Sequence, residues 1–390
     1  MSNNFITTDL VAREALLLLR NNLVAARLFD NRYEANFTGE EKIGDTVRIR
    51  RRDEGEVQEF TTTIQKDTIQ ETNVSLTLEK HFDASFEVTT KQLTLDIQDF
   101  SEQILAPRMI RLAEAVDAYA LTKLHLLPNV ARVNTPYSGA SGNIPSTLPN
   151  SIAALAEARQ TLNEQRVPLT GRFQIASPTY ETTLLSVGDF MTADKRGDGG
   201  SALEAASLGR VMGLDTFMAQ QVHDTTFTSG TFTDGDINGV HAVGATVLNL
   251  DGTNTATASL VAGDLLFIAG YGNVTVAAPA TAAGSAVTVQ IFEPLSKAVA
   301  DNASVTKFGG SGSTFQRHGA IFHPRAFAFA SVPLVIPPEA EGTMVSFEGL
   351  SIRAIRDYDI NTKRSVMSLD VLVGATLVDG NLGAQVIRPA

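Results

Sequence analysis

The longest alternating pattern in the chain covers residues 74–88, Val74-Ser75-Leu76-Thr77-Leu78-Glu79-Lys80-His81-Phe82-Asp83-Ala84-Ser85-Phe86-Glu87-Val88. Apolar and polar residues alternate throughout, with Lys80 as the one polar residue on the apolar side, and this period of two predicts a β-strand. At about 3.3 Å per residue such a strand spans roughly 50 Å, whereas strands of about six residues are typical. A strand of this length either bends around a domain or projects from one. A projecting strand needs a partner to cover its apolar side, so the segment gives a first indication of an assembling protein.

Residues 9–29 show the spacing of an amphipathic helix. Asp9 can cap its start, and the apolar residues that recur at helical spacing are Leu10, Leu17, Val24 and Leu28. No helical partner lies nearby in the sequence, so we expect either an arm that packs on a distant surface or the ordinary first helix of a domain. If it is an arm, deletion of residues 1–30 should leave a folded chain that assembles poorly.

Two further helices are expected downstream. The first covers residues 101–127, ends at Pro128, and carries one apolar stripe made of Leu105, Met109, Leu112, Val116, Tyr119 and Leu124. The second covers residues 151–165 and is rich in alanine. After it, residues 172–178 predict a short buried strand and a turn, and residues 179–187 predict a short helix.

The composition changes most sharply over residues 225–315. Only eight of these 91 residues are charged. Short alternating runs such as 246–250 and 286–291 predict a small β-barrel or β-sandwich, because they are separated by frequent turns and show no helical spacing. Mixed helix and strand patterns resume afterwards, so we expect this segment to be an inserted all-β domain.

Length, charge and cysteine content limit the class of protein. The 390 residues allow two or three packed units, and 43% hydrophobic residues are typical of a globular chain. A net charge of −12 disfavours a main surface that grips nucleic acid, and the absence of cysteine excludes disulfides and thiolate chemistry. No apolar run approaches the roughly 18 residues that cross a bilayer, and the start of the chain lacks the basic region of a signal peptide.

No catalytic or cofactor-binding pattern is found in the sequence. Phosphate-binding loops and zinc-binding His-Glu-x-x-His helices are missing, and the six histidines are scattered. Residues 234–239, Asp-Gly-Asp-Ile-Asn-Gly, match the first half of a calcium loop, but Ala245 stands where the bidentate glutamate is needed. A turn that joins two strands is the favoured interpretation. We therefore expect no enzyme activity, no cofactor and no metal.

The only dense basic run consists of Arg48, Arg50, Arg51 and Arg52. Three interpretations remain open: a nucleic-acid contact, a solvated strand edge that prevents aggregation, and an ionic contact with a neighbouring subunit. The first is disfavoured because no aromatic residue is interleaved and acidic residues follow directly. We favour the inter-subunit contact, and expect replacement of all four by alanine to weaken assembly, most visibly at low salt.

Three segments, in order along the chain, resemble those of tailed-phage major capsid proteins of the Hong Kong 97 type. Residues 173–180, Phe-Gln-Ile-Ala-Ser-Pro-Thr-Tyr, are similar to the strand-to-helix step of the family's axial domain. Residues 208–217, Leu-Gly-Arg-Val-Met-Gly-Leu-Asp-Thr-Phe, resemble its glycine-punctuated turn and strand. Residues 320–330, Ala-Ile-Phe-His-Pro-Arg-Ala-Phe-Ala-Phe-Ala, look like its buried strand that leads into a helix or turn, before a proline-rich exit at 332–334.

The resemblance implies an α+β chain with the HK97-like capsid fold and an inserted β-domain, as in coat proteins of the Salmonella podovirus P22 type. The expected parts follow the order of that fold: an N-terminal arm helix (1–32), an extended β-hairpin loop (33–96), the spine helix and peripheral domain (97–170), the first part of the axial domain (171–224), the inserted β-barrel or sandwich (225–315), and return strands of the axial and peripheral domains (316–390).

By the same resemblance, the expected function is that of a major capsid protein. It forms hexamers and pentamers of an icosahedral shell that encloses double-stranded DNA without reading its sequence. A scaffolding protein, a portal protein and a decoration protein are the implied partners, with no membrane involved; the implied location is the virion capsid, and the host cytoplasm during assembly. Two alternatives are a nanocompartment shell protein of the same fold, and a bacterial surface or adhesive β-rich protein.

Overall fold

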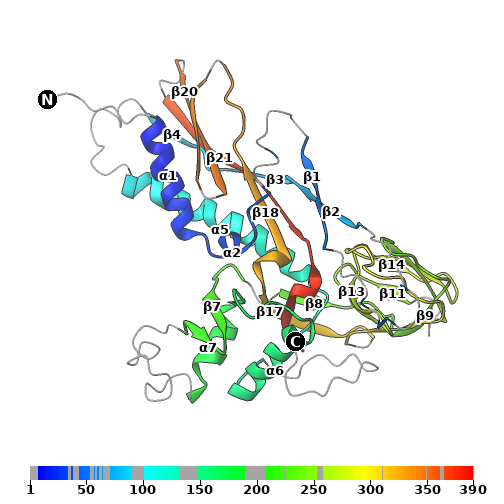
Figure 1. Cartoon of the computed structure of the whole chain (residues 1–390). Coiled ribbons are helices and arrows are strands. Elements are labelled where there is room, and N and C mark those ends of the chain that lie inside the picture. The colour runs from blue at the N-terminus through cyan, green and yellow to red at the C-terminus, as the bar shows by residue number, and fades with distance from the viewer. Residues whose placement is uncertain are drawn as a thin grey trace. The chain divides into compact units, whose positions relative to one another are not determined.

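A computed structural model describes residues 8–33, 37, 44–52, 57, 59–60, 64, 71–89, 101–131, 148–188, 208–222, 225–252, 258–309, 311–338, 340–347, 349–360 and 364–389. The chain divides into two compact units. Unit 1 consists of residues 1–47, 75–122 and 327–376, and unit 2 of residues 48–74, 123–326 and 377–390. Figure 1 shows helices and strands mixed along the chain.

The helices of unit 1 lie together against its sheet (Figure 1). They are α1 (Thr8–Asn22), α2 (Ala25–Leu28), and the π-helical turn η1 (Ser101–Leu105) that continues into α5 (Ala106–Thr122). A 3-10 turn, η2 (Lys123–Leu126), extends α5. The predicted stripe of the 101–127 helix is confirmed, because all six of its residues are buried.

The predicted stripe of the N-terminal helix is wrong. Leu10 and Leu17 are 56% and 54% exposed. The helix instead buries a different side against α5 and strands β19 and β20, formed by Val11, Ala12, Ala15, Leu16, Leu19 and Leu23. A side rich in alanine allows the helix axes to approach closely. The described part of this segment therefore contributes to the core of unit 1, and its burial disfavours the expectation that deletion of residues 1–30 leaves the fold intact.

The N-terminal helical segment breaks between α1 and α2, and a buried carboxylate holds the break. Asp117 of α5 accepts hydrogen bonds from the Val24 N–H at 2.7 Å and from the Ala26 N–H at 3.0 Å. Burial raises the pKa of Asp117, and these backbone hydrogen bonds oppose the rise. The carboxylate thus supplies an acceptor for N–H groups that the first turn of α2 leaves without a partner in the helix.

The sheet of unit 1 has the order β18-β21-β20-β19, and β3 and β4 also pair with β21. Its members are β3 (Lys80–Asp83), β4 (Phe86–Thr89), β18 (Phe327–Val332), β19 (Glu341–Phe347), β20 (Leu350–Asp359) and β21 (Arg364–Leu377). The pairs β19–β20, β20–β21, β21–β3 and β21–β4 are antiparallel. Leu350 and Ile352 of β20 and Leu369 and Val371 of β21 are buried.

The single long strand predicted at 74–88 is replaced by three shorter ones. β2 (Asn73–Thr77) pairs with β1 (Thr46–Arg50), whereas β3 and β4 add to the edge of β21. The alternation persists because each strand keeps one covered face, but two breaks change the pairing partner. Residues 80–88 are therefore part of a sheet within one chain, and do not project as a free strand. Much of the expected 33–96 loop lies outside the described residues.

The main sheet of unit 2 has the order β22-β17-β5-β7-β6, and β8 also pairs with β17. Its strands are β5 (Phe173–Ala176), β6 (Arg210–Val211), β7 (Leu214–Met218), β8 (Thr225–Thr228), β17 (Thr314–Phe322) and β22 (Gly383–Pro389). Only the β5–β7 pair is parallel. Gly319 in β17 has φ +140°, and a Cβ there would lie 2.0 Å from the Ile175 carbonyl oxygen, so the close β17–β5 approach requires glycine.

Helices α6 (Ile152–Glu164) and α7 (Pro178–Leu185) accompany this sheet, and both match the predictions. Ser151 caps α6 by accepting from the Ala154 N–H, and Ser177 caps α7 by accepting from the Tyr180 N–H. The other two segments of the capsid resemblance also have the implied local structure. Residues 210–218 form a strand, a left-handed turn at Met212 and Gly213, and a second strand, while β17 leads through a 3-10 turn, η3 (Pro324–Ala326), into β18.

Between β8 and β17 the chain forms a second sheet with a hydrophobic core of its own. Its order is β13-β12-β16-β9-β10-β15, and a bridge between Val276 and Ile291 joins the two ends. The strands are β9 (Asp234–Ile237), β10 (Val247–Asp251), β12 (Leu265–Ile268), β13 (Gly272–Thr275), β15 (Val287–Gln290) and β16 (Ser304–Lys307), beside the pair β11 (Ser259–Leu260) and β14 (Ala280–Thr281). Residues 234–237, expected in a turn, lie in β9.

The division into units differs from the expected domain boundaries. The expected 97–170 block is split, since α5 belongs to unit 1 and α6 to unit 2. The 225–315 segment is grouped with the rest of unit 2. Contacts distant in sequence cause the first difference, because α5 packs against α1 and the sheet of unit 1, whereas α6 packs near β22.

Candidate assembly surface

The hairpin formed by β1 and β2 exposes apolar side chains beyond its paired part. Val57 is 98% exposed, Phe60 67% and Ile64 73%. Nearer the base, Val47, Ile49, Val74 and Leu76 are buried. A two-stranded hairpin is only marginally stable alone in water, and large apolar side chains at such exposure mark a surface that a partner covers.

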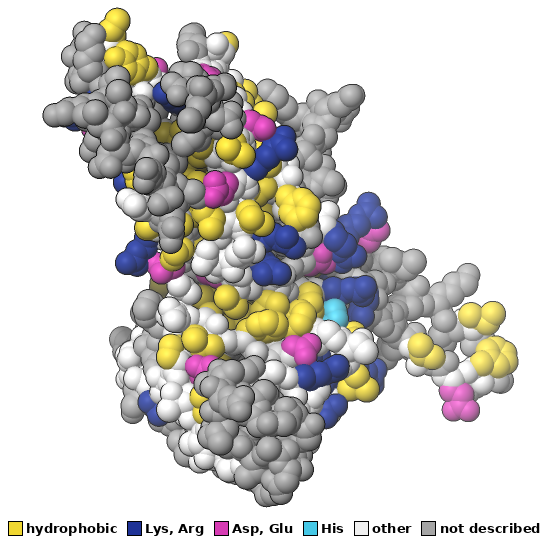
Figure 2. Space-filling model, turned by 90° about the vertical axis from the view of Figure 1, so that its left-hand side faces the viewer, with side chains coloured by type: hydrophobic (Ala, Val, Ile, Leu, Met, Phe, Trp, Pro, Cys, Tyr) yellow, Lys and Arg dark blue, Asp and Glu magenta, His cyan; other side chains and the backbone are white. Residues whose placement is uncertain are grey.

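Exposed hydrophobic residues occur in unit 1 as well. Figure 2 shows one face of the molecule, on which hydrophobic side chains lie among arginine and lysine side chains. Among the described residues of unit 1, five large ones are more than half exposed: Leu10, Leu17, Val335, Phe347 and Ile360. The Arg20 guanidinium lies 5.0 Å from the centre of the Phe347 ring and covers part of it. Apolar exposure is thus spread over the surface and is most extreme on the hairpin.

The four arginines predicted as one contact have different environments. Arg48 and Arg50 alternate with buried Val47 and Ile49, so both side chains lie on the exposed side of β1. Arg50 forms an ion pair with Glu71 across the hairpin, with Nη1 and Oε1 3.0 Å apart. Arg52, just after the strand, is also exposed.

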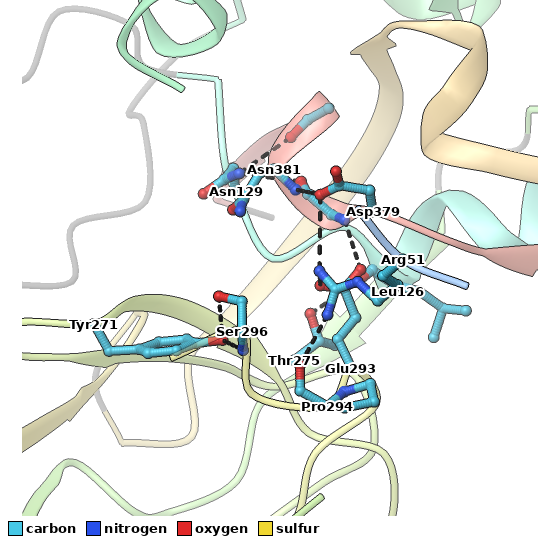
Figure 3. Close-up of polar contacts among 12 residues, drawn as sticks. Arg51, Leu126, Asn129, Tyr271, Thr275, Glu293, Pro294, Ser296, Asp379 and Asn381 are labelled. Carbon is cyan, nitrogen blue, oxygen red and sulfur yellow. Dashed lines mark hydrogen bonds and ion pairs between the residues drawn. The ribbon is translucent and has the colours of Figure 1, made fainter. Parts of the chain in front are cut away.

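Arg51 differs from the other three arginines because its side chain is turned inward. Its side chain is only 6% exposed. Nη1 donates to the Pro294 carbonyl oxygen at 2.8 Å, and Nη2 lies 3.3 Å from Glu293 Oε2 and 3.8 Å from Asp379 Oδ1 (Figure 3). These partners all lie inside its own chain, so Arg51 does not share the exposed environment of Arg48, Arg50 and Arg52.

We call the set of Arg51, Glu293 and Asp379 the clasp. It joins three distant segments of unit 2. Arg51 follows β1, Glu293 follows β15, and Asp379 precedes the 3-10 turn η4 (Gly380–Leu382). Glu293 Oε1 also accepts the Gly380 N–H at 2.5 Å (Figure 3). The Arg51 N–H donates to the Thr72 carbonyl oxygen at 2.9 Å, so the same residue is tied to the opposite strand of the hairpin. The clasp therefore fixes the base of the hairpin to unit 2.

The ionisation of Glu293 is strongly perturbed. Burial raises its pKa to about 7, and the nearby Asp379 carboxylate acts in the same direction. Arg51 and the Gly380 N–H oppose the rise because both favour the charged form. Glu293 therefore exchanges a proton near neutral pH, about where an ordinary glutamate is fully ionised.

A polar cavity of about 170 Å³ lies beside the clasp. Tyr271 lines it, and the Tyr271 hydroxyl accepts from the Ser296 N–H at 3.1 Å (Figure 3). Asn273 Nδ2 donates to Asn129 Oδ1 at 2.9 Å, which links the second sheet to the loop after η2. Lys297 is the other cation of the lining, 5.7 Å from the centre of the Tyr271 ring. These contacts attach the second sheet to the rest of unit 2.

A second buried group of charges reinforces that attachment. Arg317 of β17 donates to Gln385 and to the Gly263 carbonyl oxygen, and its guanidinium lies 4.3 Å from the centre of the Phe227 ring. Asp264 accepts the Gly230 and Val261 N–H groups. Burial raises the pKa of Asp264 and lowers that of Arg317 to about 10, which is the direction expected when charges leave water.

The partners of Arg51 were missed by sequence reasoning. Glu293 is 242 residues away from it, and no local pattern connects the two. The one available signal was the rarity of charge in residues 225–315. Three of the eight charged residues there, Asp264, Glu293 and Lys307, are held in buried polar contacts.

Within the described ranges, no group of three or more histidine, aspartate or glutamate side chains is placed to hold a metal ion. None of the described helices is both long and apolar enough to span a bilayer.

Comparison with known proteins gives matches in structure alone. Neither a protein-family model nor a curated protein sequence matches the chain. Phage capsids are among the solved structures that it resembles. A structure from Mycobacterium phage Che8 has a TM-score of 0.49 and 14% identity over 93% of this chain and 90% of that chain. The mature capsid of bacteriophage PhiM1 has a TM-score of 0.46 and 11% identity, over 88% and 81%. A virus-like particle from Pyrococcus furiosus has a TM-score of 0.42 and 8% identity, over 98% of both chains.

Proposed function

We propose that this chain is a major capsid protein of a tailed phage, with the HK97-like fold, and that copies of it assemble into an icosahedral shell around double-stranded DNA. The observation that carries the proposal is the β1–β2 hairpin. It exposes Val57, Phe60 and Ile64 while its base is held by buried Arg51. A firmly held base combined with an uncovered apolar end suits an element that seats on another subunit.

Local structure along the chain supports the same family. The three segments that resemble phage capsid proteins form the strand-to-helix step, the turn between two strands, and the buried strand followed by a turn that the resemblance implies. We further propose that residues 225–315 are an inserted β-domain as in P22-type coat proteins. Their separate hydrophobic core supports this.

The charge of the chain is compatible with a DNA container. A net charge of −12 disfavours tight binding to packaged DNA, and lets the DNA move within the shell. Hexamers and pentamers, a scaffolding protein, a portal protein and a decoration protein complete the proposal, with assembly in the host cytoplasm and the virion as the final location. Arg48 and Arg50 remain candidates for ionic contacts between subunits, because their side chains lie on the exposed side of β1.

Electron microscopy of purified protein tests the hairpin's role. We expect the wild-type chain to form closed shells, alone or with a scaffolding protein, and a V57D/F60D/I64D variant to remain as small soluble species with an unchanged circular dichroism spectrum. Val240→Asp is the matched control, since Val240 is 73% exposed on the second sheet's segment. Shells formed equally well by the triple variant, or lost equally in the control, would contradict the assignment.

A further inference from the structure

The clasp contains more negative than positive charge. One guanidinium, that of Arg51, faces two carboxylates, those of Glu293 and Asp379. Their side chains are 6%, 17% and 16% exposed, so water screens them weakly. Lys297 and Tyr271 line the adjoining cavity, where Lys297 is exposed and lies over the Tyr271 ring. With both carboxylates ionised the clasp has a net charge of −1, and a single proton makes it neutral.

The contacts of the clasp show which segment would become less restrained if the clasp opened. Arg51 makes polar contacts from the hairpin to residues 293–294 and 379. Thr72, on the opposite strand, lies near Gly244 of the second sheet's segment. Both of these positions lie at the base of the hairpin. Loosening the clasp therefore removes polar contacts that hold the base of the hairpin, while the buried Val47, Ile49, Val74 and Leu76 still pack there.

We propose that a proton on Glu293 closes this clasp and that loss of the proton loosens it, so that the hairpin is held more firmly in mildly acidic than in mildly alkaline solution. The protonated carboxyl removes the repulsion from Asp379 and leaves Arg51 to pair with that single charge. The carbonyl oxygen of the protonated Glu293 carboxyl still accepts the Gly380 N–H. Deprotonation buries an additional negative charge, and opening the clasp lets water solvate it.

The direction follows from proton linkage. The closed clasp raises the pKa of Glu293 to about 7, and an opened, hydrated glutamate returns to its ordinary value near 4.5. Because the raised pKa belongs to the closed form, the stabilising effect is fully present below the ordinary value and is lost as the pH rises through about 7. The closing equilibrium should weaken on the order of 100-fold across this window.

One consequence rests on the proposed function. If the hairpin seats on a neighbouring subunit, the clasp makes its freedom to adjust dependent on pH, and mildly alkaline solution permits the greater range of hairpin orientations. The clasp itself is a property of the single chain and can be measured before any shell forms.

Hydrogen–deuterium exchange of the unassembled full-length chain tests the clasp, because the Gly380 N–H donates to Glu293 and the Arg51 N–H lies at the hairpin base that the clasp holds. After correction for intrinsic rates, exchange of peptides that contain these amides should rise between about pH 5.5 and pH 8.5. Glu293→Gln, which stays neutral, should abolish the rise and keep both amides protected. Glu71→Gln is the matched control, since Glu71 also pairs with a hairpin arginine but is exposed.

The outcomes separate the clasp from the shell. A corrected exchange rate that does not change with pH in the wild type, or a rise that persists in Glu293→Gln, would overturn the proposal. The same rise in wild type and Glu71→Gln, lost in Glu293→Gln, supports it. Failure of the chain to form shells would remove the proposed function and leave the exchange result unchanged.

Discussion

Replacement of Leu19 by alanine measures how far α1 belongs to the core of unit 1. Leu19 is completely buried, on the side of α1 that packs against α5 and the sheet. Removing three side-chain carbons from such a site costs about 3 kcal/mol, because both burial and packing are lost. Leu17→Ala is the matched control two residues away, and Leu17 is 54% exposed, so its replacement should cost less than about 0.5 kcal/mol.

Urea unfolding followed by circular dichroism at about 222 nm reads this difference, since α1, α2 and α5 supply helical signal to unit 1. For an m-value of about 2 kcal/mol/M, Leu19→Ala should lower the midpoint of the unit 1 transition by about 1.5 M. The Leu17→Ala midpoint should stay close to that of the wild type. Equally small shifts in both variants would refute the burial argument. They would instead support the interpretation of α1 as an arm that can detach from unit 1.

Three further predictions concern unit 2. Arg51→Met should destabilise it by about 3 kcal/mol at mildly alkaline pH, because two buried carboxylates lose their cation, whereas Arg50→Met should cost below about 0.5 kcal/mol in the same urea titration. Since the pKa of Glu293 is raised to about 7, wild-type stability should fall on the order of 2–3 kcal/mol as the pH rises from about 4.5 to about 8, and Glu293→Gln should flatten that profile. Gly319→Ala, whose new Cβ would lie 2.0 Å from a carbonyl oxygen, should cost about 3 kcal/mol or more in thermal unfolding, against about 1 kcal/mol for Gly284→Ala, where φ is +71° and no atom lies within 4 Å.

Regular patterns with one packing partner were predicted well from the sequence. The 101–127 helix buries its large apolar stripe, so periodicity identifies both the helix and its covered side. The same reasoning fails for α1, because its covered side uses alanine. Hydrophobic spacing drew attention to Leu10 and Leu17, while close helix packing depends on small Ala12 and Ala15.

Alternation over residues 74–88 predicted covered faces but not pairing partners. An alternation with a period of two means that successive side chains point to opposite sides of a strand. This holds in β2, β3 and β4. It carries no information on which strand supplies the backbone hydrogen bonds. β2 pairs with β1 and the other two pair with β21, nearly 300 residues away in the case of His81 and Leu372.

The candidate site was predicted in part. The arginine run was recognised as unusual, and strand alternation explains why Arg48 and Arg50 share the exposed side of β1. The role of Arg51 depends on Glu293 and Asp379, which only the tertiary structure brings together. A buried charge far from its partner in sequence leaves no local pattern. The clasp can therefore be recognised only in the folded structure.

Shell formation is tested most directly by sedimentation velocity of the wild-type chain, with and without a scaffolding protein, followed by electron microscopy of the fastest fraction. The proposed function predicts a discrete, rapidly sedimenting species that consists of closed particles of uniform diameter. A single slow species with the mass of one 41.6 kDa chain, at every concentration and in both conditions, would contradict it.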